Sequence, residues 1–225
     1  MNPLDLFHLQ VRLEGREVVH GSLLRQVEVV PDEEMPLMVI ALLSPRELVA
    51  YYDEALSPEL RNSLSRQIHS LNFPSVDPLI EVLQPQYPYL ETGHFKTYTF
   101  PEHYKDFTFD EVNRFPKTDP KVQAFGFGDF AGEVYAIEKN GKIISACVST
   151  RENGFCGEAW VYTDIAYRNQ GFAQKVVGAW SNELISAGKI PFYSYKVQNK
   201  ASANLASRLG LQPVFEEIVI SYVHV

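Results

Sequence analysis

The clearest pattern of hydrophobic and polar positions lies in the last third of the chain, where a short apolar run precedes a turn and a long amphipathic helix. The run Ala159–Tyr162 combines bulky apolar and aromatic side chains, which is typical of a buried strand. Beyond it, apolar side chains recur at every fourth position and form one stripe of a predicted helix: Phe172, Val176, Trp180 and Leu184, with Val177 and Ile185 beside them. Gly188 is expected to end this helix.

The turn between this strand and this helix, residues 163–171, has the features of an anion-binding site. Gly171 and the small Ala173 leave the backbone accessible where the helix begins. Unpaired N–H groups and the positive end of the helix dipole point the same way there, so a phosphate is a suitable ligand. The same segment also fits an ordinary connection whose glycine only eases packing, and the local pattern leaves both interpretations open.

The residues around this segment predict a sheet. Glu133–Glu138 and Ile143–Thr150 read as strands, joined at Asn140-Gly141, a pair that accepts positive φ in a hairpin turn. A second turn over residues 151–154 leads into the strand that opens at Phe155. The elements expected beyond the long helix are a strand over 190–197, a short helix capped at Asn199 and ended by Gly210, and a last strand over 214–225.

The first 90 residues carry helical patterns and are predicted to form a mostly helical region. Ser44-Pro45-Arg46-Glu47 has the features of a capping box and predicts a helix to about Leu56. Ser57-Pro58 predicts the start of a second amphipathic helix, and residues 76–83 predict a third, shorter one.

Two further segments of the chain define the predicted domains. Leu9–Leu13 alternates apolar and polar residues as a short strand would. Residues 84–101 combine prolines with aromatic strand formers and mark the boundary between two domains, residues 1–90 and 91–225. Residues 101–132 read as irregular, with an aromatic surface loop over a pocket as the expected role of their Phe-Gly repeats.

Composition limits the classes of protein to which the chain can belong. Its formal net charge is -8 and its pI is near 5.3, whereas a general nucleic-acid binder needs a basic surface. Cys147 and Cys156 are too few for a disulfide framework or a zinc site, and we expect two buried thiols in a reducing compartment. The N-terminus does not resemble a signal peptide, and the longest apolar run, Leu37–Leu43, is too short for a membrane span. We therefore expect a cytoplasmic protein that binds neither nucleic acid nor membrane.

Two motifs in the C-terminal half resemble those of the GNAT superfamily of acyl-CoA N-acyltransferases. The run Arg168-Asn169-Gln170-Gly171-Phe172-Ala173 matches the R/Q-x-x-G-x-G/A pattern of that family, after a strand and at the start of a helix. Asn199-Lys200-Ala201-Ser202, followed by Leu205 and Gly210-Leu211, is similar to its second helix motif. The resemblance covers residues 132–225 and implies an α/β (α+β) GNAT fold, with a mixed, mostly antiparallel sheet flanked by helices.

The resemblance also implies an acyl-CoA donor substrate, acetyl-CoA in our prediction, and no metal. The backbone of the turn would bind the pyrophosphate, and the preceding strand would splay from its neighbour and pair with the pantetheine arm in β fashion. Asn199 also fits a plain N-cap, and Arg168 also fits a surface ion pair. The residues predicted to bind acetyl-CoA are Val161, Tyr162, Thr163, Arg168, Asn169, Gln170, Gly171, Phe172, Ala173, Asn199 and Ser202.

Amide formation needs a base, because an alkyl amine is mostly an ammonium ion at neutral pH. Glu158, on the strand before the turn, is the predicted base, and a solvent-facing position is its alternative. A strand N–H near Val161 or Tyr162 is the expected donor to the developing oxyanion.

The departing thiolate is often protonated in this family by a tyrosine that follows the leucine equivalent to Leu205. This sequence has Ala206 there. Tyr195 is predicted to take this catalytic role, with Tyr193 as the alternative, and buried aromatic packing also fits both residues.

The resemblance therefore predicts an enzyme, an N-acetyltransferase that moves an acetyl group from acetyl-CoA to an amine of a small molecule by direct attack in a ternary complex. The alternative is a catalytically inactive GNAT fold that binds acyl-CoA as a sensor or scaffold, which the missing tyrosine favours. The N-terminal region would shape the acceptor side, and a homodimer is left open.

Overall fold

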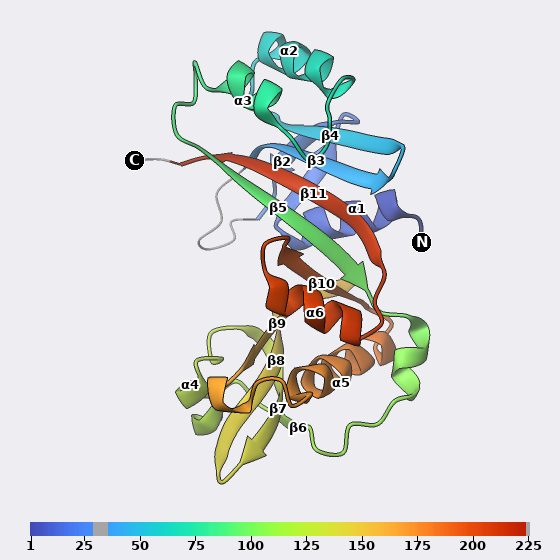
Figure 1. Cartoon of the computed structure of the whole chain (residues 1–225), viewed down its shortest axis with the longest axis vertical. Coiled ribbons are helices and arrows are strands. Elements are labelled where there is room, and N and C mark those ends of the chain that lie inside the picture. Colours follow the sequence, from blue (N-terminus) through green and yellow to red (C-terminus); the bar gives the residue numbers. More distant parts are fainter. Residues whose placement is uncertain (29–35, 224–225) are drawn as a thin grey trace. The chain divides into compact units, whose positions relative to one another are not determined.

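The computed structural model describes residues 1–28 and 36–223, and it divides the chain into two compact units (Figure 1). Unit 1 comprises Met1–Lys96 and Val214–Val225, and unit 2 comprises Thr97–Pro213. The chain therefore leaves unit 1 within one strand and returns to it for its last strand. Among the described residues, no helix is long and apolar enough to cross a membrane.

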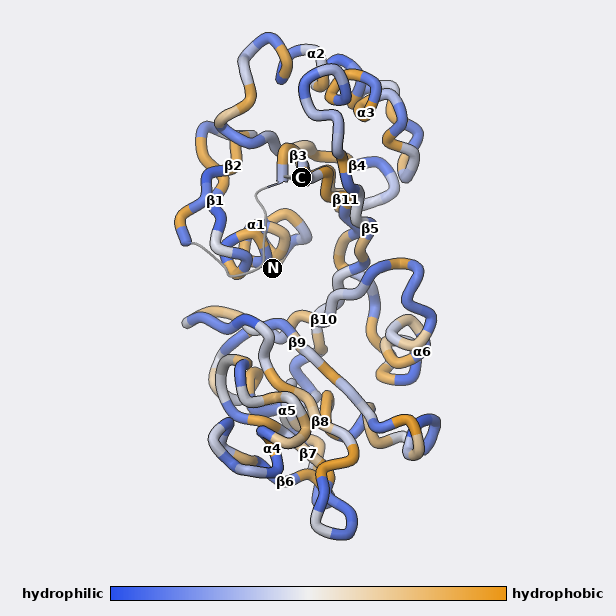
Figure 2. The backbone as a smooth tube through the Cα atoms, turned by 90° about the vertical axis from the view of Figure 1, so that its left-hand side faces the viewer, coloured by the Kyte–Doolittle hydropathy of each residue, from blue (hydrophilic) through white to orange (hydrophobic). Residues whose placement is uncertain are grey.

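Unit 1 is a sheet with helices. Its strands follow the order β1-β2-β4-β3-β11-β5. Its elements are α1 (Pro3–Leu13), β1 (Arg16–Val19), β2 (Leu23–Gln26), β3 (Pro36–Ser44), β4 (Glu47–Asp53), α2 (Pro58–Ile68), α3 (Asp77–Leu83), the first part of β5 (Leu90–Thr99) and β11 (Pro213–Tyr222). Leu64 of α2 and Leu79 of α3 share one buried cluster with Ile40 of β3 and Ile218 of β11. Figure 2 shows α2 and α3 alternating between hydrophobic and hydrophilic colours, as helices with one buried face do.

The predicted helices at Ser57-Pro58 and at residues 76–83 are confirmed. Ser57 caps α2 by accepting a hydrogen bond from the Leu60 N–H at 3.2 Å, and Pro58 occupies its first position. Local capping chemistry accounts for α2, and the spacing of the leucines accounts for both helices.

The predicted helix from Ser44 to about Leu56 is wrong, because Pro45 and Arg46 form a tight turn between two antiparallel strands. Ser44 of β3 pairs with Glu47 of β4 across this turn. The residues that follow, Leu48–Tyr52, are rich in β-branched and aromatic side chains, and their pairing with β3 outweighs the capping box.

The predicted strand over Leu9–Leu13 is also wrong, since these residues form the end of α1. Asn2 caps this helix through the Asp5 N–H at 2.8 Å, and Pro3 is its first residue. The buried positions Phe7, Gln10 and Val11 are spaced for a helix. With four strands among its three helices, the region before residue 90 is mixed in the described residues rather than mostly helical.

Unit 2 contains the four strands predicted over residues 133–197, in a sheet with strand order β5-β10-β9-β8-β7-β6, whereas the predicted last strand belongs to unit 1. Residues 101–132, predicted to be irregular, contain a short strand and a short helix. Neighbours from β6 to β9 are antiparallel, whereas β9 and β10 are parallel. Its elements after β5 are η1 (Glu102–Asp106), β6 (Asn113–Phe115), α4 (Pro120–Phe125), β7 (Ala131–Lys139), β8 (Lys142–Glu152), β9 (Cys156–Thr163), η2 (Ile165–Tyr167), α5 (Phe172–Ser186), β10 (Ile190–Lys196) and α6 (Lys200–Arg208). The mixed, mostly antiparallel sheet flanked by helices is confirmed.

The sheet of unit 2 has a buried cluster on each face. Cys147 of β8 belongs to the cluster formed with Val176 and Trp180 of α5. Its neighbours Ala146 and Val148 belong to the cluster that includes Val122 of α4. Alternation along β8 thus fixes α5 on one face and α4 on the other.

Candidate functional site

Strand β9 is paired differently along its two halves. It pairs with β8 from Gly157 to Thr163, but its parallel pairing with β10 covers only Cys156, Gly157 and Glu158. The last pair is Glu158 with Phe192, after which the two strands separate. We call Cys156–Glu158 the closed end of β9 and Ala159–Thr163 its open end, because one edge of the open end has no strand partner in the described residues.

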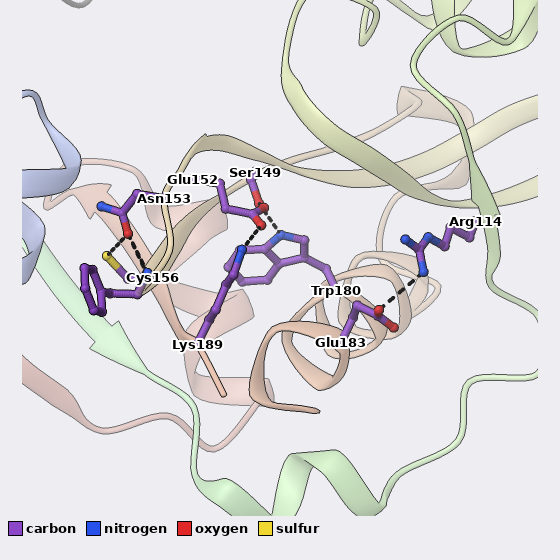
Figure 3. A network of polar contacts seen from close by, with 9 residues as sticks. Arg114, Ser149, Glu152, Asn153, Cys156, Trp180, Glu183 and Lys189 are labelled. Carbon is purple, nitrogen blue, oxygen red and sulfur yellow. Dashed lines mark hydrogen bonds and ion pairs between the residues drawn. The ribbon is translucent and has the colours of Figure 1, made fainter. Parts of the chain in front are cut away.

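A polar network surrounds the closed end (Figure 3). The Trp180 Nε1–H of α5 donates to Ser149 Oγ at 3.0 Å, and Ser149 Oγ donates to Glu152 Oε2 at 2.6 Å. Lys189 Nζ, which lies just before β10, donates to Glu152 Oε1 at 2.8 Å. Glu152 thereby links β8, α5 and the start of β10 at the end of the sheet where β9 and β10 are paired.

Cys147 and Cys156 are both buried thiols, as expected. Burial raises the pKa of Cys156 to about 11, although its contact with Asn153 Oδ1 lowers it somewhat. Burial also raises the pKa of Cys147 well above its ordinary value. Both groups are therefore neutral thiols near pH 7.

The turn after the open end has the backbone of an anion site. Asn169 and Gly171 adopt positive φ, 62° and 85°, which a glycine accepts most easily. Helix α5 begins directly after Gly171, and no side chain caps it. Within the described residues, the N–H groups of Gly171, Phe172 and Ala173 donate to no backbone acceptor. They remain available to a ligand, at the positive end of a 15-residue helix.

One pocket of about 410 Å³ joins this turn to the open end of β9 and to α6. Ten of the eleven residues predicted to bind acetyl-CoA line it: Val161, Tyr162, Thr163, Arg168, Asn169, Gly171, Phe172, Ala173, Asn199 and Ser202. Gln170 does not; its side-chain amide donates to the Ala166 carbonyl at 3.4 Å. The structure thus brings together residues that are about 40 positions apart in the sequence.

The lining is basic although the whole chain is acidic. It includes Arg168 and Arg208, and no Asp or Glu among the residues that the structure describes. The Arg168 Nε–H donates to the Thr163 carbonyl at 3.1 Å, and its guanidinium lies 5.5 Å from the centre of the Tyr162 ring. Such a pocket suits an anion.

Sequence reasoning missed Arg208. This residue ends α6, and its carbonyl accepts a hydrogen bond from Gln174 of α5 at 3.1 Å. Ala201, Leu205 and Arg208 follow each other at intervals of four and three, so they share one face of the helix. Extending the second motif by one turn along that face would have identified it.

Asn199 is the N-cap of α6, as its alternative interpretation held. Its Oδ1 accepts a hydrogen bond from the Ser202 N–H at 3.1 Å. Both side chains also line the pocket, so capping and ligand contact do not exclude each other.

The predicted catalytic residues Glu158 and Tyr195 do not line the pocket. The Glu158 carboxylate is 3.3 Å from the Arg151 guanidinium, and its side chain is 12% exposed. The Tyr195 hydroxyl is 2.8 Å from that of Tyr98. Tyr193, the alternative to Tyr195, does line the pocket, and burial raises its pKa to about 12. The catalytic assignments stay predictions.

Residues 121–219 match the family model described as GNAT acetyltransferase. No curated protein sequence matches the chain. Its fold is similar to that of a GCN5-related N-acetyltransferase-like protein from Streptococcus suis, with 13% identity over 87% of each chain and a TM-score of 0.51.

Two other solved structures are also similar to the chain. A protein described as an acetyltransferase from the GNAT family, from Novosphingobium aromaticivorans, has 15% identity over 61% of this chain and 69% of its own, with a TM-score of 0.49. An acetyltransferase from the GNAT family of Colwellia psychrerythraea has 9% identity over 78% of this chain and 77% of its own, with a TM-score of 0.49. Of these three solved structures, the one from Streptococcus suis, with a TM-score of 0.51, supports the fold. The family model thus identifies residues 121–219 as a GNAT acetyltransferase domain.

Proposed function

We propose that the protein is an acyl-CoA-dependent N-acyltransferase that moves an acetyl group from acetyl-CoA to an amine of a small molecule. The observation that carries this proposal is the single pocket that joins the uncapped N-terminus of α5 to the open end of β9. Acetyl-CoA would use the helix N-terminus and the strand edge at once, because it carries phosphates at one end and a chain of amides with a thioester at the other.

The phosphates would bind at the turn. Free N–H groups at Gly171, Phe172 and Ala173 provide donors in a row, and the α5 dipole favours negative charge there. Arg168 and Arg208 add two positive charges at the same pocket. In a chain with a net charge of -8, this local excess of positive charge favours an anionic ligand.

The pantetheine arm would pair with the open end of β9. Backbone N–H and C=O groups on an unpaired strand edge need partners, and an extended chain of amides supplies both donors and acceptors. Val161, Tyr162 and Thr163 line the pocket along this edge. An N–H of the same edge would stabilise the oxyanion that forms at the thioester carbonyl.

The acceptor amine would approach from the other face of β9. Glu158, Trp160 and Tyr162 alternate along the strand and therefore share that face. Trp160 is 51% exposed and stacks on Phe130, with 5.9 Å between ring centres. An exposed aromatic surface favours organic cations, which is the form of most amines at neutral pH. Glu158 would accept the proton of the amine, directly or through water.

The competing function is a GNAT fold that holds acyl-CoA as a sensor or scaffold without turnover. Ala206, 1% exposed in the core beside the pocket, provides no proton donor. This observation favours the competing function, whereas the complete pocket fits both.

Two measurements on the full chain separate these functions. Calorimetry with acetyl-CoA tests the donor site, and release of free thiol across a panel of amines tests turnover. We expect binding and an amine-dependent release of thiol. Binding without release for any amine would support the sensor or scaffold, and no binding of acetyl-CoA would refute both functions.

A further inference from the structure

Two exposed aromatic side chains of β9 lie on the face of the sheet away from α5. Trp160 is 51% exposed and Tyr162 is 41% exposed, whereas Val161 between them packs against the cluster that includes Trp180 of α5. The Trp160 ring stacks on Phe130, with 28° between the ring planes. The Tyr162 ring centre lies 5.6 Å from that of Phe125. Exposed apolar side chains that gather in one place mark a binding surface, whereas single ones are ordinary.

The segment between α4 and β7 supports these two rings from the side. Phe125 ends α4, and Phe130 directly precedes β7. Both phenylalanines pack against the buried cluster that includes Val122 and Val148. The neighbours of Trp160 and Tyr162 are therefore held in place by the core. A surface that is ordered before binding loses little conformational entropy when a ligand settles on it.

The two rings differ in what they leave open to a ligand. The Arg168 guanidinium already lies 5.5 Å from the centre of the Tyr162 ring, so a second cation there would be repelled. Trp160 has an uncharged neighbour, Phe130, and half of its surface remains exposed. The open surface of Trp160 is thus available to the apolar body of a cationic ligand.

Charged groups on both sides of Trp160 would orient such a cation. Glu158 precedes Trp160 by two positions on the same face of the strand, and Arg168 lies on the other side, at Tyr162. An ammonium group is attracted by the carboxylate and repelled by the guanidinium, so the nitrogen should lie on the Glu158 side. Arg151, 3.3 Å from the Glu158 carboxylate, already balances part of its charge. Contact of the apolar body with Trp160 therefore contributes most of the affinity.

Strand geometry limits the distance between the nitrogen and the apolar body. Side chains two positions apart on one face of a strand begin about 7 Å from each other. A nitrogen beside Glu158 and a ring on Trp160 would be separated by a similar distance, which a spacer of about two or three carbon atoms provides.

We propose that the acceptor is an amine whose nitrogen is joined through this short carbon spacer to a flat apolar ring, and that the ring stacks on Trp160. The inference rests on the proposed function and names the chemical class of its acceptor. The nitrogen then lies beside Glu158, at the boundary of the open end along which the thioester would bind. Small polar amines and polyamines carry no ring, so they lose the contact with Trp160.

The experiment measures thiol release from acetyl-CoA by the full chain with amines that share one ethylamine unit. 2-Phenylethylamine carries a flat ring, 2-cyclohexylethylamine carries a ring of similar size that is not flat, and ethylamine carries none. We expect kcat/KM to fall in that order. The first step should be roughly twofold to tenfold, the contribution of aromatic stacking, and the second roughly tenfold or more, the effect of the apolar area that is buried.

These amines also differ in basicity, so the decisive comparison is between protein variants. Trp160→Ala should lower kcat/KM for 2-phenylethylamine by roughly tenfold and that for ethylamine by less than about twofold, because only the first amine loses a ring contact. Phe155→Ala is the matched control, since Phe155 lies directly before β9 and is a 64% exposed aromatic residue of the same unit. It should leave kcat/KM for both amines unchanged.

A binding measurement on the wild-type protein does not depend on the folding of any variant. The chain has two tryptophans, and Trp180 is only 1% exposed, so acrylamide quenches the fluorescence of Trp160 far more than that of Trp180. In the presence of coenzyme A, 2-phenylethylamine should protect Trp160 from quenching at concentrations at which ethylamine does not. Equal protection by the two amines, or none by either, would overturn the inference.

The outcomes separate this inference from the proposed function. If no amine releases thiol, the proposed function is wrong and the inference with it. If ethylamine or a polyamine is used as well as 2-phenylethylamine, only the inference is wrong. The same holds if Trp160→Ala lowers kcat/KM equally for all amines, because Trp160 would then support the open end of β9 without selecting the acceptor.

Discussion

The two ends of β9 share one strand and one partner, β8, but their polar groups are satisfied in different ways. At the closed end, Cys156–Glu158, both edges of the strand are paired and the neighbouring side chains form a continuous network. At the open end, Ala159–Thr163, one edge has no strand partner in the part of the chain that the structure describes. The pocket begins where that pairing stops.

This difference shows how a sheet can leave part of one strand edge unpaired while the rest of the strand stays in place. A free strand edge would normally attract another strand, so it is tolerated only where it is short or covered. The closed end fixes the positions of β9 and β10 through Glu152, Lys189 and Trp180 (Figure 3). These contacts hold β9 and β10 together at the side where the gap between them begins.

The largest effect is expected from blocking the turn beside the open end. Gly171→Trp should weaken acetyl-CoA binding by roughly a hundredfold or more, about 3 kcal/mol, because the indole would occupy the place of the phosphates. Gly188→Trp is the matched control: Gly188 also has positive φ, 74°, at the other end of α5, and a Cβ there meets nothing within 4 Å. Both variants carry the same kind of backbone strain, so calorimetry that finds equal losses of affinity would contradict the phosphate assignment.

The next largest effect concerns the residue at the boundary of the two ends. Glu158→Gln should lower kcat by about a hundredfold, the lower range for loss of a general base, and leave the affinity for acetyl-CoA unchanged. Arg151→Met is the informative companion, since it removes the same ion pair and keeps the carboxylate. Equal losses of kcat in both variants would mean that the ion pair matters and that Glu158 is not the base.

A smaller effect is expected from the network of the closed end. Ser149→Ala leaves the buried Trp180 N–H without its acceptor and should lower the free energy of unfolding by about 1–3 kcal/mol, measured in urea. Ser145→Ala should cost less, although Ser145 is equally buried, because its partner Thr163 is partly exposed and can turn to water. Equal losses of unfolding free energy in the two variants would mean that the network around Glu152 stabilises the fold no more than the single contact between Ser145 and Thr163 does.

The sequence predicted unit 2 better than unit 1 for a physical reason. In unit 2, the pattern around Gly171 and the spacing along α5 depend on local geometry, and the structure agrees with both. In unit 1, the capping box at Ser44–Glu47 also favoured a local structure, the start of a helix, but pairing between β3 and β4 outweighed it. That pairing extends from Ser44–Glu47 to Met38–Tyr52, so it depends on residues outside the four positions of the capping box.

The same distinction applies to the site. The residues of the turn can be predicted from the motif, because phosphate binding at a helix N-terminus uses successive backbone N–H groups. The place of Arg208 in the pocket depends on how α6 packs beside α5, and Gln174 reaches Arg208 across that contact. The hydroxyls of Tyr193 and Tyr195 have different surroundings, because that of Tyr195 contacts the Tyr98 hydroxyl. Side-chain contacts of this kind can be identified only in the tertiary structure.

The smallest expected effect is an absence of reaction at the two buried cysteines, of which Cys156 lies at the closed end. The thiolate attacks iodoacetamide and displaces iodide, and burial raises the pKa of Cys156 to about 11 and that of Cys147 well above its ordinary value. Near pH 8 both thiols should therefore stay unmodified in the native protein and react fully after unfolding, as counted by mass spectrometry. The same shift makes the stability of the fold depend on pH. The folded state keeps the proton of the Cys156 thiol at a pH where the unfolded state has lost it. The stabilisation by the neutral thiol is therefore complete below the unfolded pKa of about 9 and is lost as the pH rises toward 11. Rapid modification of Cys156 near pH 8 would mean that β9 and β10 part locally at the closed end as well, and the gap could not then depend on that end being fixed.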